Sequence, residues 1–414
     1  MNTNTLLRLP AGPSVSSFTG LAGHVNMLSP ENASRLGLLP GIAGGAQGYN
    51  TEGDVITTTV DGVDLNNIWQ EFQKTVALRN SQRQSLIDFL TYSVSEPVET
   101  IPVFGAGTDF EVASEFGVPK GARTEASYFQ MGFAFEWYDV AGRFTWKYLA
   151  EATAAQIESV HQSILEADNR NVFREVMATL FDPTNRLATI QKQAYSVYAL
   201  YNADGTVPPP WKTNTFTGTH THYLASGAAT VDSGDLDELS THIQHHGYTP
   251  TEGVEIVVMV NKAQGDVIRQ FRSLANGGTA QYDFIPAQGT PSLLMPKDMV
   301  TGEARRPAAT LRGLKVIGSY GDLTVVQEDY IPAGYLVAFG TGGSNSLTNP
   351  IGIREHRNTA LRGLRLVKGR SPDYPLQDSY YQRGFGTGIR QRGAAAIMQI
   401  RATGSYAPPA EYTR

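Results

Sequence analysis

Between Tyr128 and Tyr138 the chain alternates between large apolar residues and small or polar ones. A period of two residues predicts a strand with one apolar face. Residues 100–116 predict an antiparallel partner strand, joined to it by turn-forming residues 117–123. Because an isolated hairpin is only marginally stable in water, we expect the apolar face to lie on a neighbouring copy of the chain. This face consists of Phe129, Met131, Phe133, Phe135 and Trp137.

Residues 151–182 change to a helical period and predict one long helix. Pro183 follows it, and proline cannot continue a helix interior. We expect one apolar stripe of this helix to pack on the rest of the protein. The predicted stripe contains Ile157, Val160, Ile164, Ala167, Val176 and Leu180.

The segment before the hairpin divides into two parts. Residues 1–61 are rich in Gly, Ser, Thr and Asn with little periodicity, which predicts an extended arm that docks on another surface, or alternatively a disordered tail. Asp64 is suited to cap a helix, and helical spacing continues, in one or two helices, until Glu96 and Pro97. The apolar positions are Leu65, Ile68, Trp69, Phe72, Val76, Leu86, Ile87 and Leu90.

The second half of the chain predicts a compact α/β unit. Residues 186–201 are β-rich, and the prolines at 208–210 mark the boundary before this unit. Residues 388–403 predict one long strand, whose partner we expect beside the strand that follows the long helix. Within the unit, the pattern predicts helices at 235–246 and 264–274 and strands at 255–260, 314–326 and 335–339.

Composition narrows the classes of function. The chain has 414 residues and no cysteine, which excludes disulfides and cysteine nucleophiles. Its net charge of −6 does not indicate a generally basic surface that binds nucleic acid. Only 17% of residues are charged, a value that fits a surface used for interfaces and equally a β protein with neutral loops. No apolar run approaches the ~18 residues of a membrane helix, so we expect no membrane partner.

Histidine is the only residue type whose spacing suggests a metal site. His220 and His222 would share a face on a strand, and His242 and His246 would share a face on a helix. Partial spacing of this kind is more typical of solvated or hydrogen-bonded histidines, and the chain lacks the HExxH, GxSxG and P-loop motifs. We therefore expect no enzyme and no cofactor, with a metal-dependent enzyme built on these histidines as a remote alternative.

Residues 354–392 carry an excess of positive charge. Three interpretations stay open: pairing with acidic surfaces of other subunits, a lining that contacts packaged nucleic acid through phosphates, or ordinary ion pairs within the chain. The cations are Arg354, Arg357, Arg362, Arg365, Lys368, Arg370, Arg383, Arg390 and Arg392.

The C-terminal half contains four distinctive sequence motifs: YIPAGY at 330–335, RLVKGR at 365–370, YPL at 374–376 and DSYYQRGFG at 378–386. Together with the order of elements, these segments resemble the HK97-like major capsid proteins of tailed phages, in particular those of phages of actinobacteria. The resemblance covers nearly the whole chain.

The resemblance implies an α+β fold with a division of the chain into named parts. Residues 388–403 would be the return strand of the peripheral domain. The implied parts are an extended N-arm (1–62), an N-terminal helical segment (63–96), an E-loop hairpin (97–148), a peripheral domain with the long spine helix (149–217), an α/β axial domain (218–368), and a return to the peripheral domain with the C-terminal tail (369–414).

The resemblance also implies a function. The chain would be a structural subunit that self-assembles as hexamers and pentamers into an icosahedral shell around phage double-stranded DNA. It would be located in the virion capsid after assembly in the bacterial host cytoplasm. An encapsulin-type compartment shell is the alternative. Besides other copies, the expected partners are a portal, an optional cement protein, DNA contacted non-specifically, and a separate scaffolding protein, because no long charged helical leader follows Met1.

Nine residues are the expected assembly contacts. Some family members join an E-loop lysine to an asparagine of a neighbour. Lys120 lies at the hairpin tip, but no asparagine or glutamate partner can be identified, so we expect a solvated or ion-paired lysine. The nine residues are Phe129, Phe133, Phe135, Trp137, Lys120, Arg123, Arg365, Arg370 and Arg383.

Overall fold

The structure is a computed structural model. It describes residues 56–81, 85–104, 112–113, 115–117, 126–190, 192–288, 307–311, 314–369 and 376–414. Most of the expected arm at residues 1–62 lies outside these ranges, as do Lys120, Arg123 and Arg370.

A five-stranded sheet forms around one long strand, β16. β4 runs antiparallel along one edge of β16, while β15 and β14 follow one another, also antiparallel, along the other edge. β1 continues the sheet as a parallel partner of β14. The strands are β1 (Thr91–Val94), β4 (Glu136–Arg143), β14 (Ile351–Glu355), β15 (Leu364–Lys368) and β16 (Asp378–Ile389).

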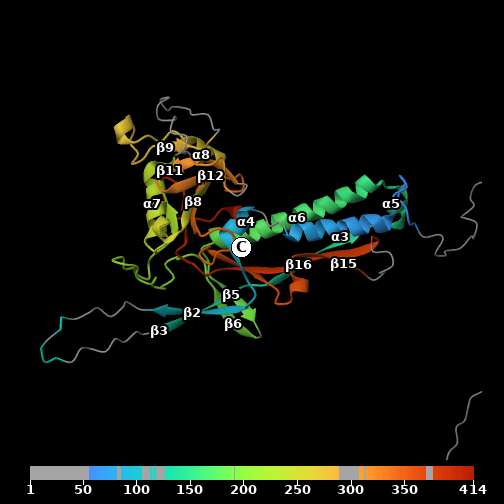
Figure 1. Cartoon of the computed structure of the whole chain (residues 1–414), viewed down its shortest axis with the longest axis horizontal. Coiled ribbons are helices and arrows are strands. Elements are labelled where there is room, and N and C mark those ends of the chain that lie inside the picture. The colour runs from blue at the N-terminus through green and yellow to red at the C-terminus, as the bar shows by residue number, and fades with distance from the viewer. Residues whose placement is uncertain are drawn as a thin grey trace, which may run out of the picture.

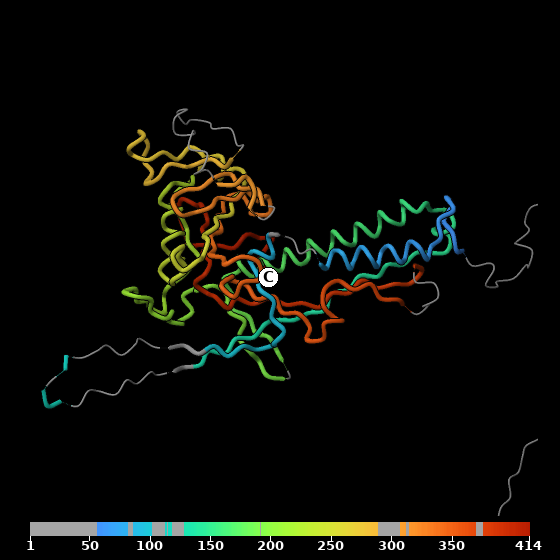
Figure 2. Tube along the Cα trace, viewed as in Figure 1, coloured from blue at the N-terminus to red at the C-terminus, as the bar shows by residue number. Residues whose placement is uncertain are grey.

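Two helices, α3 (Leu65–Ser81) and α6 (Ala154–Phe181), lie side by side over one face of this sheet (Figure 1). The expected helix after Asp64 is confirmed, with all five of its predicted apolar positions buried. Segments from both ends of the sequence meet here, since α3 lies above β15 and β16 (Figure 2). The short helices α4 (Ser85–Leu90) and α5 (Trp146–Glu151) flank the pair.

α6 is the predicted long helix, and its ends have clear local causes. Thr153 and Gln156 form a reciprocal capping box, so the helix begins at Ala154 rather than at 151. It ends at Phe181, and Asp182 is the C-cap residue before Pro183. The predicted stripe was partly wrong: Val160, Ile164 and Ala167 are half-buried. The buried positions of α6 are Ile157, His161, Leu165, Val172, Phe173, Val176, Met177, Ala178, Thr179, Leu180 and Phe181.

A mixed eight-stranded sheet forms the α/β unit, in the order β10-β11-β12-β8-β13-β17-β7 with β9 paired to β11. Its strands are β7 (Tyr223–Ala225), β8 (Glu255–Val260), β9 (Phe284–Pro286), β10 (Thr310–Leu311), β11 (Leu314–Tyr320), β12 (Leu323–Gln327), β13 (Tyr335–Thr341) and β17 (Ala395–Gln399). Its helices are α7 (Ser233–Gln244) and α8 (Lys262–Ile268), with short 3₁₀ turns η4 (Pro250–Glu252) and η5 (Leu274–Asn276). Two further 3₁₀ turns lie outside this unit: η7 (Thr359–Leu361) connects β14 to β15, and η8 (Ala410–Tyr412) contacts α6.

Two predicted strands were wrong in the same way, because each is divided between two strands. Residues 314–326 turn back at Gly321, whose positive φ of 54° suits glycine, and form the β11–β12 hairpin. Residues 388–403 contain the end of β16 and all of β17, which lie in different sheets. β17 pairs with β13 and β7 in the α/β sheet and not with the strand after α6. Conversely, β14 and β15 fall within residues 218–368, the range expected for the axial domain, and yet they pair in the first sheet.

The aromatic hairpin is also divided. β2 (Val98–Phe104) pairs with β3 (Ala126–Gly132), and the two strands project from the body (Figure 1). The predicted single strand through Tyr138 was wrong, because β3 ends at Gly132 and the chain then enters the first sheet as β4. A second hairpin, β5 (Arg186–Ile190) with β6 (Gln193–Val197), lies beside β3 and confirms the β-rich prediction there.

One hydrophobic cluster joins the two sheets. It contains residues from the C-terminal half of α6, from β13 and β17 of the α/β sheet, and from β14 and β16 of the first sheet, among them Leu180, Phe339 and Ile389. The C-terminus returns to the same place, where Arg414 forms an ion pair with Glu175 of α6 at 2.7 Å. Among the described helices, none has the length and apolar character that a bilayer span requires.

His161 is a polar residue at the centre of the helix–sheet contact. Its ring stacks on Phe72 of α3 with 3.9 Å between centroids, and its Nδ1 lies 2.7 Å from the Tyr381 hydroxyl of β16. Only 1% of the residue is exposed. Burial, helped by the nearby charge of Arg79, lowers the pKa of His161 to about 4.

This burial predicts acid sensitivity. As the pH falls below 6.5, His161 becomes protonated in the unfolded chain, but in the folded chain it stays neutral until the pH approaches 4. We expect this group to lower the free energy of unfolding of the isolated subunit by about 2–3 kcal/mol between pH 7 and pH 4. His161→Gln does not titrate and should lose that part of the decrease. Urea unfolding at both pH values measures it, and equal pH dependence in the two proteins would contradict the assignment.

Candidate functional site

The first sheet has a second face, opposite α3 and α6. Partners in antiparallel register point to the same side, so Trp137 lies with Gly384, and Arg365 lies with Gln382, on the face away from the helices. Gly384 is required there, because a Cβ would come within 2.7 Å of the Trp137 indole. Trp137 is 51% exposed in the single chain. We call this surface the open face.

The open face contains residues that the sequence reasoning missed. Tyr380 and Asp378 follow the same alternation along β16, and Arg143 of β4 binds both, with its Nε 3.2 Å from Asp378 Oδ1 and its NH2 group donating to the Tyr380 hydroxyl at 3.0 Å. Alternation within residues 378–384 is a signal that could have found them. The face thus combines Trp, Tyr and Arg side chains.

The predicted aromatic face of the hairpin divides between the interior and the surface. Phe133 was wrong as an assembly contact: it is fully buried within its own chain, beside Tyr92 and Met131, because the backbone leaves the hairpin there to cross the first sheet. Phe129 is half-buried on Tyr198, with 4.4 Å between ring centroids.

Phe135 and Trp137 remain near the surface. Phe135 is half-buried, with the Arg354 guanidinium 4.9 Å from its ring centroid and the Trp137 ring edge-on at 5.4 Å. On the projecting hairpin, Val112 and Phe116 are 97% and 92% exposed. Large apolar side chains with this exposure have no cover among the described residues of their own chain.

Four of the nine cations in the positive segment form ion pairs within the chain. Arg383, one of the expected assembly contacts, donates two hydrogen bonds of 2.7 Å to the Asp168 carboxylate of α6, which is 7% exposed. Its role in assembly stays a prediction. Three further arginines of the segment pair with carboxylates of the same chain: Arg357 with Glu96, Arg390 with Glu99, and Arg392 with Asp204. Intramolecular pairing therefore accounts for part of the positive charge, and Arg365 is half-buried on the open face.

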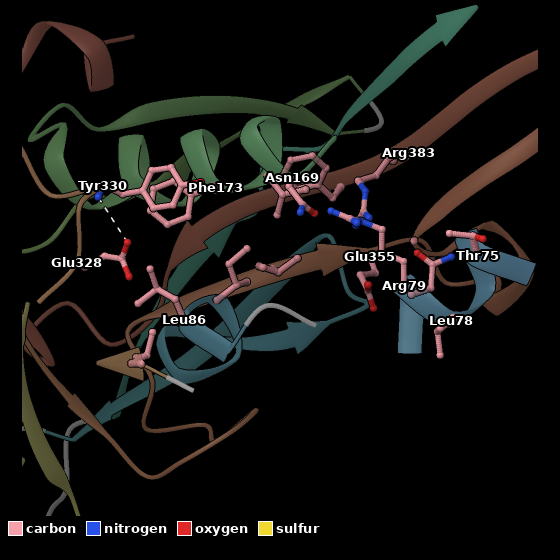
Figure 3. A pocket seen from close by; sticks show the side chains of 18 residues that line it. Thr75, Leu78, Arg79, Leu86, Asn169, Phe173, Glu328, Tyr330, Glu355 and Arg383 are labelled. Carbon is pink, nitrogen blue, oxygen red and sulfur yellow. Dashed lines mark hydrogen bonds between the residues drawn. The ribbon is translucent and has the colours of Figure 1, made fainter. Parts of the chain in front are cut away.

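A pocket of about 610 Å³ lies between α3, α4, α6 and β16 (Figure 3). Arg79, Glu355 and Arg383 lie toward one end, and Glu328 lies at the other end beside Tyr330 and Phe173. Arg383 is already held by Asp168. The lining combines apolar and charged groups without an arrangement of nucleophile and base, so this pocket supports no particular reaction.

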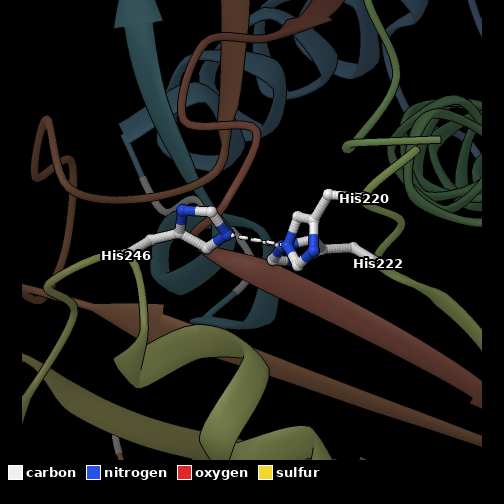
Figure 4. Close-up of side chains that lie close together, drawn as sticks. All are labelled: His220, His222 and His246. Carbon is white, nitrogen blue, oxygen red and sulfur yellow. Dashed lines mark hydrogen bonds between the residues drawn. The ribbon is translucent and has the colours of Figure 1, made fainter. Parts of the chain in front are cut away.

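Three of the four candidate histidines do meet. His220, His222 and His246 point their Nε2 atoms at one another (Figure 4), with separations of 3.0 Å for His220–His222, 3.0 Å for His220–His246 and 2.9 Å for His222–His246. Burial lowers the pKa of His220 to about 4 and of His246 to about 3, and lowers that of the fully buried His222 as well, so all three rings are neutral at pH 7.

His242, the fourth candidate, does not join this cluster. α7 ends at Gln244, so His246 lies beyond the helix and the expected i, i+4 pairing with His242 was wrong. The Nδ1 of His242 lies instead 3.0 Å from the backbone oxygen of Glu238.

Comparison with known proteins decides the family. A solved structure from Mycobacterium phage Patience is 47% identical in sequence, with a TM-score of 0.69, and the match covers 90% of this chain and 97% of the other. The chain belongs to the HK97-fold major capsid proteins of tailed phages. This major capsid protein is thus a structural subunit of a phage shell, and the predicted α+β capsid fold is confirmed.

Two other solved structures are much less similar. The capsid of an empty GTA particle is 12% identical, with a TM-score of 0.42 and coverage of 91% of this chain and 100% of the other. The holo-SrpI encapsulin complex from Synechococcus elongatus PCC 7942 is 11% identical, with a TM-score of 0.40 and coverage of 81% and 97%. No protein-family model and no curated protein sequence matches the capsid protein.

The Arg383–Asp168 ion pair is expected to stabilise the isolated subunit, independently of assembly. Asp168→Ala leaves the mostly buried guanidinium of Arg383 without its carboxylate, so we expect a loss of about 2–3 kcal/mol in the free energy of unfolding of the subunit. Glu166→Ala, in the exposed pair with Arg170 on the same helix, should cost less than about 0.5 kcal/mol. Urea unfolding compares them, and a loss of less than about 0.5 kcal/mol for Asp168→Ala, as in the exposed control, would contradict a stabilising role for Asp168.

Proposed function

We propose that the capsid protein assembles through its projecting hairpin and its open face, each covered by a neighbouring copy, into hexamers and pentamers of an icosahedral shell around double-stranded DNA. The exposure of Val112, Phe116 and Trp137 supports this most directly. Soluble proteins rarely leave such apolar surface uncovered unless a partner occupies it.

The chemistry of the open face fits a protein interface. Trp, Tyr and Arg are enriched where interfaces lose water, and Trp137, Tyr380 and Arg365 lie on this one face. Trp137 lies flat against the backbone at Gly384 and offers a rigid aromatic surface. Such a group contributes contact area at a low cost in conformational entropy.

Repetition makes the contacts sufficient. A standard interface buries about 1,600 Å² in total, and each subunit of a closed shell both gives and receives a hairpin. The contacts therefore act on every copy, and the stability of the shell depends on assembly as it does in obligate oligomers.

The net charge of −6 argues that DNA is held inside the shell by enclosure and local phosphate contacts, without sequence recognition. A structural role without catalysis is part of this proposal, and the lining of the pocket between α3, α4, α6 and β16, which combines apolar and charged groups, supports no particular reaction. Assembly in the host cytoplasm with a separate scaffolding protein, a portal and an optional cement protein completes this proposal. Lys120, at the hairpin tip, would carry charge without a crosslink.

Electron microscopy of purified particles tests the proposal. We expect closed shells with nuclease-protected double-stranded DNA. Shells that lack protected DNA and contain an enzyme cargo would favour the encapsulin-type alternative. A chain that stays monomeric at high concentration, with and without its scaffolding protein, would overturn the proposal.

Trp137 and Phe133 form a matched pair for the interface. Trp137→Ala should reduce shell yield at least about tenfold while changing the free energy of unfolding of the subunit by less than about 1 kcal/mol, because its exposed ring packs on a neighbour. Phe133→Ala should destabilise the subunit itself by about 3–4 kcal/mol. Sedimentation and urea unfolding give the two readouts, and normal shell yield for Trp137→Ala would remove that residue from the interface.

A further inference from the structure

We propose that His220, His222 and His246 bind a zinc-type divalent transition-metal ion through their three Nε2 atoms. The three atoms form a nearly equilateral triangle with sides of 2.9–3.0 Å. Tetrahedral zinc with bonds of about 2.05 Å places its nitrogen ligands roughly 3.3 Å apart. The rings need to separate by only a few tenths of an ångström to accept the ion.

Hydrogen bonding cannot satisfy this triangle. Each Nε2 presents a single in-plane site, which carries either a proton or a lone pair. There are three Nε2 atoms but only two possible states, protonated or unprotonated, so at least two of the three atoms are in the same state. At least one contact of about 3 Å therefore places two protons, or two lone pairs, against each other. An ion that accepts three lone pairs removes this conflict.

The surroundings fix one ring as a metal ligand requires. His222 Nδ1 lies 2.6 Å from the backbone oxygen of Ala395, which can only accept a hydrogen bond. The proton of neutral His222 is therefore on Nδ1, and its Nε2 carries the lone pair. A ligand histidine that donates its other N–H to a carbonyl is the usual outer arrangement of zinc sites.

Packing holds the other rings in position. The His246 ring lies between Phe216, with 4.3 Å between ring centroids, and Tyr201, at 5.4 Å. Gly393 leaves the space for it, since a Cβ there would approach His246 Cγ within 2.6 Å. His220 contacts the same Phe216 ring at 4.9 Å. The donors are thus arranged in advance, which favours binding.

The three imidazole ligands indicate which kind of ion binds, and the elements that carry them indicate its structural role. Three neutral imidazoles suit zinc and its transition-metal neighbours better than calcium or magnesium, which prefer oxygen. No carboxylate joins the cluster within the described residues. The ion would tie the end of α7 to the segment before β7, whose His222 backbone bonds to Ile397 of β17. It would act as a structural clasp in the α/β sheet, with a fourth position for water.

Metal uptake by the full-length chain tests this inference, whether the chain is assembled or not. After chelation and desalting, zinc is added and elemental analysis and thermal unfolding follow. We expect about one zinc per chain and a rise in melting temperature of several degrees. His246→Asn and His220→Asn should weaken zinc binding by more than about 100-fold, since loss of even an outer hydrogen-bond partner costs about 10- to 100-fold.

His242→Gln is the control, because His242 lies near His220 but outside the triangle. It should bind zinc as the wild type does. Cobalt gives a second readout, because tetrahedral visible-absorption bands are expected in both the wild type and His242→Gln. No zinc or cobalt bound by the wild type, or equal binding by the wild type and His246→Asn, would overturn the proposal.

Discussion

The contact between α6 and β16 is the interaction on which the rest of the subunit depends. Arg383 and Asp168 join the two elements by a nearly buried, two-fold hydrogen-bonded ion pair, and His161 joins them through Tyr381 while it stacks on α3. Leaving either polar group without its partner in this core costs far more than a surface contact does. The contact therefore fixes the position of the helix pair on one face of the sheet, and by doing so leaves the other face open.

β16 connects this contact to the other strands of the first sheet. It carries β4 on one edge and both β14 and β15 on the other, and the C-terminal half of α6 enters the core that also contains β13 and β17. The two sheets are thus bound through a shared core, with the projecting hairpin attached at its base by buried Met131 and Phe133. The hairpin is therefore fixed at its base by the core of its own chain.

The surface and the histidine cluster illustrate two different uses of side chains. Trp137 and Phe116 are exposed, and under the proposed assembly they contribute free energy only when a neighbouring copy covers them. His220, His222 and His246 face one another, and an ion would stabilise each subunit by itself. Assembly and folding can therefore be measured separately in this protein, with mutations in one region as controls for the other.

The sequence by itself determined α3, α6, β8 and the resemblance to the family, because helical and strand periods are local and the C-terminal motifs are specific. It also indicated a projecting hairpin, but not where the hairpin ends. Only the tertiary structure decided where patterned segments change sheet, as at Gly132 and between β16 and β17, since an unbroken apolar pattern does not say which neighbour covers it. It also decided that Arg383 points inward, that His161 lies in the core, and that His246 meets His220 and His222 rather than His242. Those pairings join residues distant along the chain, and local spacing contains no information about them.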